Sequence, residues 1–180
     1  MIVSTARLLL RPPVPGDAAV LSRLMTKEVS HRTASWPYPL SEAAAEAKLR
    51  EVIAAERAHR SFARLITQRE DGTPMGWLVV ALVNDAPRTG SLGYWLGTAF
   101  HRQGYLSEAL MPFVQAAISA LQIERLEAGV QATNAASVAL LKKLGMQFIG
   151  RQMHYVPARE REEAADFYAM DCHSAVNPSR

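Results

Sequence analysis

The stretch from His101 to Leu110, HRQGYLSEAL, combines residues that suit the binding of an anion. It lies between a strand-like run, Ser91–Gly97 (SLGYWLG), and a run whose apolar residues have helical spacing. A helix start exposes backbone N–H groups without intrahelical partners, and the helix dipole adds partial positive charge. Gly104 lets a ligand approach the backbone closely, and Arg102 adds a full charge. The pattern predicts a phosphate-binding turn; the alternative is a plain strand–helix turn with a glycine for geometry.

The elements that must position this turn follow from the spacing of apolar residues. Strand-like runs cover residues 7–12, 61–68, 75–83, 91–97, 125–131, 146–151 and 166–172, with a hairpin turn at Asp71-Gly72. Helical spacing follows Asp17 (Val20, Leu21, Leu24 and Met25), Ser41 (Ala45, Leu49, Val52 and Ile53), Gly104 (Leu106, Leu110, Phe113, Val114, Ala117 and Leu121) and Asn134 (135–144). This order predicts an α/β fold, with a mixed sheet and helices packed on its faces.

The expected helix ends rest on capping residues. Asp17, Ser41 and Asn134 are expected to cap the helices that follow them, and Gly145 to end the last one. Pro112 lies inside the third helix, where a proline removes one backbone hydrogen bond and is expected to interrupt and kink it.

Composition narrows the class of protein. A length of 180 residues favours one domain, residues 1–180. The lone Cys172 rules out an internal disulfide framework, and no Cys/His cluster predicts a metal site. The net charge of +3 comes without a Lys/Arg run, so no nucleic-acid partner is expected. No apolar stretch approaches a membrane span or a signal peptide, which favours a cytoplasmic protein without a membrane partner.

The segment GYWLGTAFHRQGYLSEAL, residues 93–110, closely resembles the acetyl-CoA-binding segment of the GNAT N-acetyltransferase superfamily, in particular its RimJ/RimL-like branch. Three further segments are similar to that branch in the same order: STARLLLRPPVPGDAAVL (4–21), WPYPLSEAAAEAKL (36–49) and RLEAGVQATNAASVALLKKLGMQFIGR (125–151). The resemblance therefore extends over nearly the whole chain.

The resemblance implies the GNAT fold and a set of cofactor-binding residues. In that fold the sheet is mixed and largely antiparallel with helices on both faces, and two central parallel strands splay apart around the pantetheine arm of acetyl-CoA. By position, the backbone of Tyr94, Trp95 and Leu96 would meet that arm, and Asn134 would face the cofactor from the other strand. The pyrophosphate would meet the turn formed by His101, Arg102, Gln103, Gly104, Tyr105, Leu106 and Ser107.

The chain departs from the family pattern at several positions. In the turn only the central glycine is kept, because Arg102 stands where a glycine is usual and Leu106 where a small residue is usual. Ser91 stands near the usual place of a carboxylate base, and Leu141 at that of a tyrosine acid. The resemblance leaves two catalytic candidates: the Leu96 backbone amide as oxyanion donor and Ser137 as hydrogen-bond donor to the thiolate. An ordinary first-turn helix serine is the alternative for Ser137.

His31, Trp36 and Tyr38 are the candidate acceptor-side residues, with surface exposure or plain packing as alternatives. The predicted function is transfer of an acetyl group from the cosubstrate acetyl-CoA to a primary amine, on a protein N-terminus or a small molecule, without a metal. A non-catalytic acyl-CoA-binding sensor and a nucleotide-phosphate-binding module are the alternatives. The resembled branch also favours a homodimer.

Overall fold

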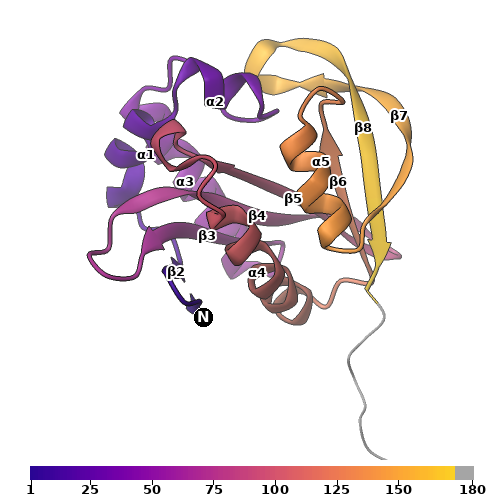
Figure 1. The fold of residues 1–180 in the computed structure, drawn as a ribbon, viewed down its shortest axis with the longest axis horizontal. Coiled ribbons are helices and arrows are strands. Elements are labelled where there is room, and N and C mark those ends of the chain that lie inside the picture. The colour runs from indigo at the N-terminus through magenta and orange to yellow at the C-terminus, as the bar shows by residue number, and fades with distance from the viewer. Residues whose placement is uncertain (173–180) are drawn as a thin grey trace, which may run out of the picture.

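The computed structural model describes residues 1–172, which form an eight-stranded mixed sheet with helices on both faces (Figure 1). The strands are β1 (Val3–Ser4), β2 (Leu8–Arg11), β3 (Ser61–Gln68), β4 (Pro74–Asp85), β5 (Arg88–Leu96), β6 (Arg125–Val130), β7 (Gln147–Val156) and β8 (Arg161–Asp171). The helices are α1 (Ala18–Leu24), α2 (Lys27–His31), α3 (Glu42–Arg57), α4 (Tyr105–Leu121) and α5 (Ala135–Lys143). The strand order is β1-β2-β3-β4-β5-β6-β8-β7, and only the β5–β6 pair is parallel.

Two cores cover the two faces of the sheet. Successive side chains of a strand point to opposite faces, so in β4 the buried Trp77 joins one core and its neighbour Leu78 joins the other. The first core is closed by α1 and α3, through residues such as Leu21 and Leu49, and the second by α4, through residues such as Phe113. The predicted α/β architecture with helices on both faces is confirmed.

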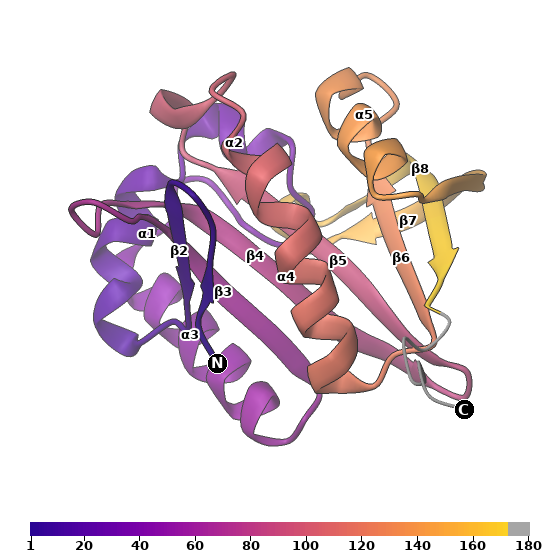
Figure 2. The ribbon, with the colours of Figure 1, turned by 60° about the horizontal axis from the view of Figure 1, so that its bottom comes forward.

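The two parallel strands pair over a short distance and then separate (Figure 2). Their ladder holds three pairs and ends at Ser91 and Glu127, whereas β5 continues to Leu96 and β6 to Val130. We call the gap between residues 92–96 of β5 and 128–130 of β6 the splay. The expected divergence of two central parallel strands is therefore confirmed, and it leaves one edge of β5 without a neighbouring strand along the splay.

Two of the three expected caps are confirmed. The Ser41 hydroxyl accepts the Ala44 N–H at 3.1 Å, and the Asn134 carboxamide oxygen accepts the Ser137 N–H at 3.3 Å. Gly145 follows α5 with a φ of 88°, the left-handed geometry that ends many helices.

The expectation for Asp17 is wrong. Its carboxylate gives no cap to α1; it is buried, accepts the Val14 N–H at 2.8 Å and forms a two-bond ion pair with Arg11. The strong Arg11 partner, placed by β2, competes successfully for the carboxylate.

The expected interruption at Pro112 is also wrong, because α4 runs through it from Tyr105 to Leu121. The missing N–H costs one hydrogen bond in a helix of 17 residues, and burial of one apolar face on the sheet outweighs it. Two short elements, β1 and α2, have no counterpart in the sequence prediction, and β7 and β8 are longer than expected. No helix in residues 1–172 has the length and apolar character needed to cross a membrane.

Candidate functional site

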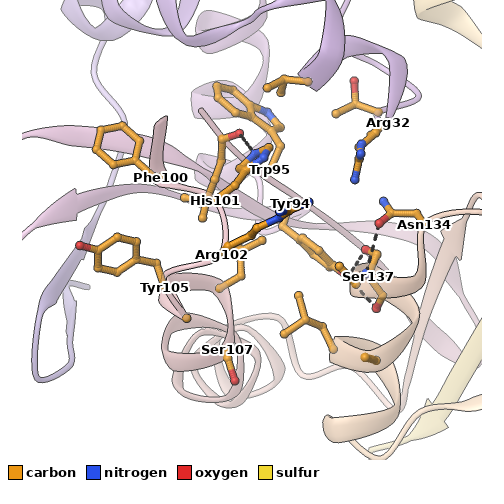
Figure 3. Close-up of a pocket in the computed structure, with 18 of the residues that line it drawn as sticks. Arg32, Tyr94, Trp95, Phe100, His101, Arg102, Tyr105, Ser107, Asn134 and Ser137 are labelled. Carbon is orange, nitrogen blue, oxygen red and sulfur yellow. Dashed lines mark hydrogen bonds between the residues drawn. The ribbon is translucent and has the colours of Figure 1, made fainter. Parts of the chain in front are cut away.

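A pocket of about 520 Å³ opens at the splay, between the end of β5, the start of α4, the start of α5 and the α2 segment (Figure 3). Its lining contains every predicted cofactor-binding or catalytic residue except Gln103: Tyr94, Trp95, Leu96, His101, Arg102, Gly104, Tyr105, Leu106, Ser107, Asn134 and Ser137. Three separate segments of the chain, within residues 28–33, 94–107 and 134–143, thus form one cavity.

The backbone of β5 presents hydrogen-bonding groups to the splay. The Gly97 N–H donates to the Met75 carbonyl at 2.8 Å, and in an antiparallel ladder every second residue makes such bonds. Trp95 therefore pairs with β4, whereas the N–H and C=O groups of Tyr94 and Leu96 point to the splay. His101 confirms this direction, since its Nε2 lies 2.9 Å from the Leu96 carbonyl oxygen.

The turn between β5 and α4 has the geometry of an anion site. Gly104 precedes the first helical residue with a φ of 79°, and Arg102 has a φ of 60°. Left-handed geometry at Arg102 explains why a glycine would also suit that position. The first N–H groups of α4 face the pocket mouth beside Gly104, where a phosphate would find unpaired donors and the helix dipole.

A clamp from the N-terminal hairpin holds this turn. Glu108, in the first turn of α4, accepts hydrogen bonds from the Thr5 hydroxyl at 2.5 Å and from Arg7 through N and Nε at 2.8 and 2.7 Å. Arg7 also donates through Nη1 to the Gln103 carbonyl at 3.1 Å. Burial works to raise the pKa of Glu108, but these hydrogen bonds and the Arg7 charge outweigh it and lower that pKa.

Positive charge dominates the pocket lining. Arg102 lies at the turn, Lys143 donates from the end of α5 to the Ser107 hydroxyl at 2.5 Å, and Arg32 enters from α2. Of the residues that the structure describes, Glu28 is the one carboxylate in the lining. The pocket therefore suits a polyanionic ligand.

A pair of hydroxyl groups lies at the α5 side of the pocket. The Tyr94 Oη and Ser137 Oγ are 2.6 Å apart, and the Ser137 N–H is held by Asn134. Burial raises the pKa of Tyr94 to about 12, although its hydrogen bond with Ser137 acts in the opposite direction. The sequence prediction used only the Tyr94 backbone and missed the contact of its side chain with Ser137.

The three predicted acceptor-side residues lie outside the pocket lining. Trp36 is 3% exposed and packs edge-on against Trp77 and Trp95, while Tyr38 and His31 are exposed. The pocket wall opposite α4 and α5 is lined by Glu28, Val29, Arg32 and Thr33. These residues belong to α2 and to the turn that follows it. Since α2 has only five residues, the spacing of apolar residues in the sequence does not reveal it.

The positions where the resembled family places a base and an acid offer neither group. Ser91 pairs with Ala81 and Glu127 inside the sheet, and Leu141 is 1% exposed in the core. Within residues 1–172, no group of three or more His, Cys, Asp and Glu side chains could hold a metal ion.

A pocket between diverging strands, with backbone donors along one wall and a cationic helix start at its mouth, has the features expected of a CoA-dependent acyltransferase. The family described as Acetyltransferase (GNAT) domain matches residues 7–147. The chain therefore belongs to the GNAT acetyltransferase family, as its sequence resemblance predicted.

Solved structures share the fold over almost the whole chain. RimJ from Mycobacterium smegmatis, in complex with CoA-disulfide, has a TM-score of 0.81 at 23% identity and covers 95% of this chain and 87% of its own. An acetyl transferase from Salmonella typhimurium, which modifies the N-terminal serine of a ribosomal protein, has a TM-score of 0.79 at 20% identity. The match covers 96% of this chain and 100% of that one. The microcin self-immunity acetyltransferase MccE, in complex with acetyl-CoA and AMP, has a TM-score of 0.79 at 17% identity. The match covers 93% of this chain and 93% of that one. No curated protein matches the sequence.

Proposed function

We propose that this acetyltransferase acetylates a primary amine, with the N-terminal amine of a protein as the first acceptor class to test. The observation that carries the proposal is the Leu96 amide, which faces the splay beyond the last β5–β6 pair. An amide in that position suits the oxygen of a thioester carbonyl at the inner end of a bound acyl-CoA. The relatives named RimJ and the N-terminal-serine acetyl transferase support a protein N-terminus as acceptor.

We assign roles to the lining residues by the atoms that become negatively charged during the reaction. The amine nitrogen attacks the thioester carbon, and the carbonyl oxygen becomes negative, where the Leu96 N–H would donate to it. The C–S bond then breaks and its electron pair goes to sulfur, beside the Ser137 hydroxyl. The N–H and C=O groups of Tyr94 and Leu96 would hold the pantetheine arm, with Trp95 between them keeping its backbone bonds to β4.

The cofactor phosphates would lie at the turn and the start of α4. Arg102 supplies a charge there, the N–H groups around Gly104, Tyr105, Leu106 and Ser107 supply donors, and His101 and Gln103 shape the turn through bonds to Leu96 and Ala99. Asn134 would orient the cofactor while it caps α5.

We propose that water, rather than a protein base, removes the amine proton. Ser91 is not a carboxylate, and Glu28 is half-exposed with Arg32 at 3.8 Å. A neutral amine that enters from the α2 side needs no strong base. In this proposal the exposed His31 and Tyr38 contribute to the acceptor approach from outside the pocket lining, and the buried Trp36 contributes through its packing against Trp95.

An acceptor screen tests the function. The protein is incubated with acetyl-CoA and peptides that begin with Ser or Ala, together with small amines, and products are identified by mass spectrometry and free-thiol release. We expect an amine-dependent mass gain of one acetyl group. The same peptides with a blocked N-terminus are the matched control. Acetyl-CoA binding without turnover on any amine would instead support the sensor alternative.

Thermal unfolding tests the remaining alternative. Acetyl-CoA should raise the unfolding temperature by mass action, and ATP at the same concentration should raise it less. A larger shift with ATP would favour a nucleotide-binding module. We further propose that residues 1–180 act as a single domain, in the cytoplasm, as a homodimer.

A further inference from the structure

The hydroxyl groups of Tyr94 and Ser137 meet across the splay (Figure 3). Tyr94 projects from β5 and Ser137 lies in the first turn of α5, 43 positions later. Their oxygens are 2.6 Å apart, and both residues line the pocket. A hydrogen bond of this length fixes the direction of the donor's proton and leaves the proton of the accepting hydroxyl free to bond elsewhere.

The hydrogen-bonding capacity of the pair limits how its protons are arranged. Each hydroxyl has one proton and two acceptor sites. Burial raises the pKa of Tyr94 to about 12, so its phenol keeps its proton at neutral pH. The two acceptors near Tyr94 are the Ser137 Oγ at 2.6 Å and the Ser137 carbonyl oxygen at 3.4 Å, and the shorter contact is the better bond. When Tyr94 donates to Ser137 Oγ, the Ser137 proton is left to point into the pocket.

We propose that Tyr94 is a positioning residue for the leaving group: its hydroxyl donates to Ser137 and directs the Ser137 proton toward the CoA sulfur. The inference rests on the proposed function, because it concerns the sulfur of acetyl-CoA. As the C–S bond breaks, its electron pair moves to sulfur and the thiolate accepts the Ser137 hydrogen bond. Tyr94 and Ser137 both keep their protons, and the thiolate takes the proton that the attacking amine loses to water.

Asn134 positions the serine residue, while Tyr94 bonds its hydroxyl group. The Asn134 carboxamide oxygen accepts the Ser137 N–H at 3.3 Å and fixes the first turn of α5 beside the pocket. Ser137 Oγ is therefore placed by the helix start and hydrogen-bonded by Tyr94.

Titration of bound CoA tests the proposal without an acceptor amine. The thiolate absorption of CoA is followed against pH on the wild type, Tyr94→Phe and Ser137→Ala, with desulfo-CoA complexes as the blank for Cys172. We expect both substitutions to raise the pH at which the bound thiol ionises by about one pH unit, the size expected of a hydrogen bond to a charged group. Tyr168→Phe is the matched control, since Tyr168 is 5% exposed and lies outside the pocket lining.

If Ser137→Ala changes this titration and Tyr94→Phe does not, Tyr94 only joins β5 to α5 and the proposal is overturned. The same holds if neither substitution changes it. A protein that transfers no acetyl group but shows the expected titration would refute the proposed function and retain this inference. A wild type that binds no CoA would overturn both.

Kinetics with an acceptor from the screen give a second readout. We expect Tyr94→Phe to lower kcat about tenfold while acetyl-CoA affinity stays within about twofold. In a protein that already carries Ser137→Ala, Tyr94→Phe should lower kcat by less than about twofold, because the effect of Tyr94 passes through Ser137. If Tyr94→Phe lowers kcat by the same factor with and without Ser137→Ala, the two residues act independently and a positioning role for Tyr94 is contradicted.

Discussion

Gly104 and Arg102 give the turn before α4 its shape, since both have left-handed backbone geometry, with φ of 79° and 60°. We predict that Gly104→Asp weakens acetyl-CoA binding by well over tenfold, or more than ~1.4 kcal/mol. The new side chain strains the backbone and sets a negative charge beside the pyrophosphate. Titration calorimetry measures the affinity.

The matched control is Gly72→Asp, because Gly72 also has a left-handed φ, of 75°, but lies in the β3–β4 hairpin turn away from the pocket. It should cost stability without a change in affinity. Equal affinity losses in both variants would show that the effect of Gly104→Asp is general unfolding and not lost phosphate binding.

Two substitutions at Arg102 separate charge from backbone geometry. Arg102→Gly removes the charge and suits the left-handed φ, whereas Arg102→Ala removes the charge and keeps the strain. We expect both to weaken acetyl-CoA binding less than Gly104→Asp, with a loss that shrinks as salt rises. Arg102→Gly should unfold at a higher temperature than Arg102→Ala. Equal affinity to wild type at low salt would exclude Arg102 from the site.

At the residue level, sequence reasoning works where a side chain acts on its own neighbours in the chain. Ser41, Asn134 and Gly145 have the predicted capping roles, because each acts within a few residues. Asp17 does not, since Arg11 competes for it. The Tyr94 hydroxyl could not be assigned from sequence, because its partner depends on where α5 lies across the splay.

At the level of elements, the β7–β8 hairpin supports α2, which lines the proposed acceptor side of the pocket. Arg159 donates to the carbonyls of Ser30 and Thr33 at 3.0 and 2.9 Å, and it is held by two hydrogen bonds to Glu163. These bonds, first among them that from Arg159, lower the pKa of Glu163 from 4.5 to about 2. An ion pair within the hairpin therefore holds Arg159, whose hydrogen bonds reach a segment more than 120 residues earlier in the chain.

The lowered pKa of Glu163 determines how its contribution to stability changes with pH. A carboxylate with a depressed folded-state pKa stabilises the fold above its ordinary pKa, and that contribution is lost as the pH falls through the folded value. We therefore expect Glu163→Gln to destabilise the protein at pH 7, with a difference from wild type that declines below about pH 4.5 and vanishes near pH 2. Urea unfolding across this range measures it.

Glu162→Gln is the control for this element, because Glu162 is exposed on the same strand. The stability of this variant should differ little from that of the wild type at every pH. If Glu163→Gln is also neutral at pH 7, the ion pair does not support the hairpin.

The sequence predicts long, strongly patterned elements and misses short ones. The spacing of apolar residues identifies α3 and α4 because 16 and 17 residues repeat it several times. In α2, five residues complete little more than one turn, and the Thr26 cap and the burial of Val29 stabilise it rather than a repeated pattern. The wall of the pocket that α2 forms was missed for that reason.

At the scale of the whole molecule, sequence distance limits what can be predicted. The order of segments and the family resemblance together predict the sheet and the splay. The clamp between Arg7 and Glu108 joins residues 101 positions apart, and no local signal marks it. Such contacts depend on the assembled sheet, which brings the N-terminal hairpin beside α4 (Figure 2).

The edge strand β7 supports the proposed homodimer. Phe148, Ile149, Met153 and Tyr155 are 44–61% exposed along it, and an apolar edge favours pairing with another chain. We expect sedimentation to give about twice 19.8 kDa, and Met153→Asp to reduce the dimer fraction. Val83→Asp, at an exposed residue of β4, is the control. A monomeric wild type would contradict the proposal.

The most direct test of the central claim is the protection of individual β5 amides when acetyl-CoA binds in the splay. Amide hydrogen exchange is measured by NMR with and without acetyl-CoA. We predict that exchange slows strongly at Tyr94 and Leu96, whose N–H groups face the splay, and changes little at Trp95, whose N–H already pairs with β4. An acetyl-CoA complex in which Tyr94 and Leu96 exchange as fast as in the free protein would contradict the account.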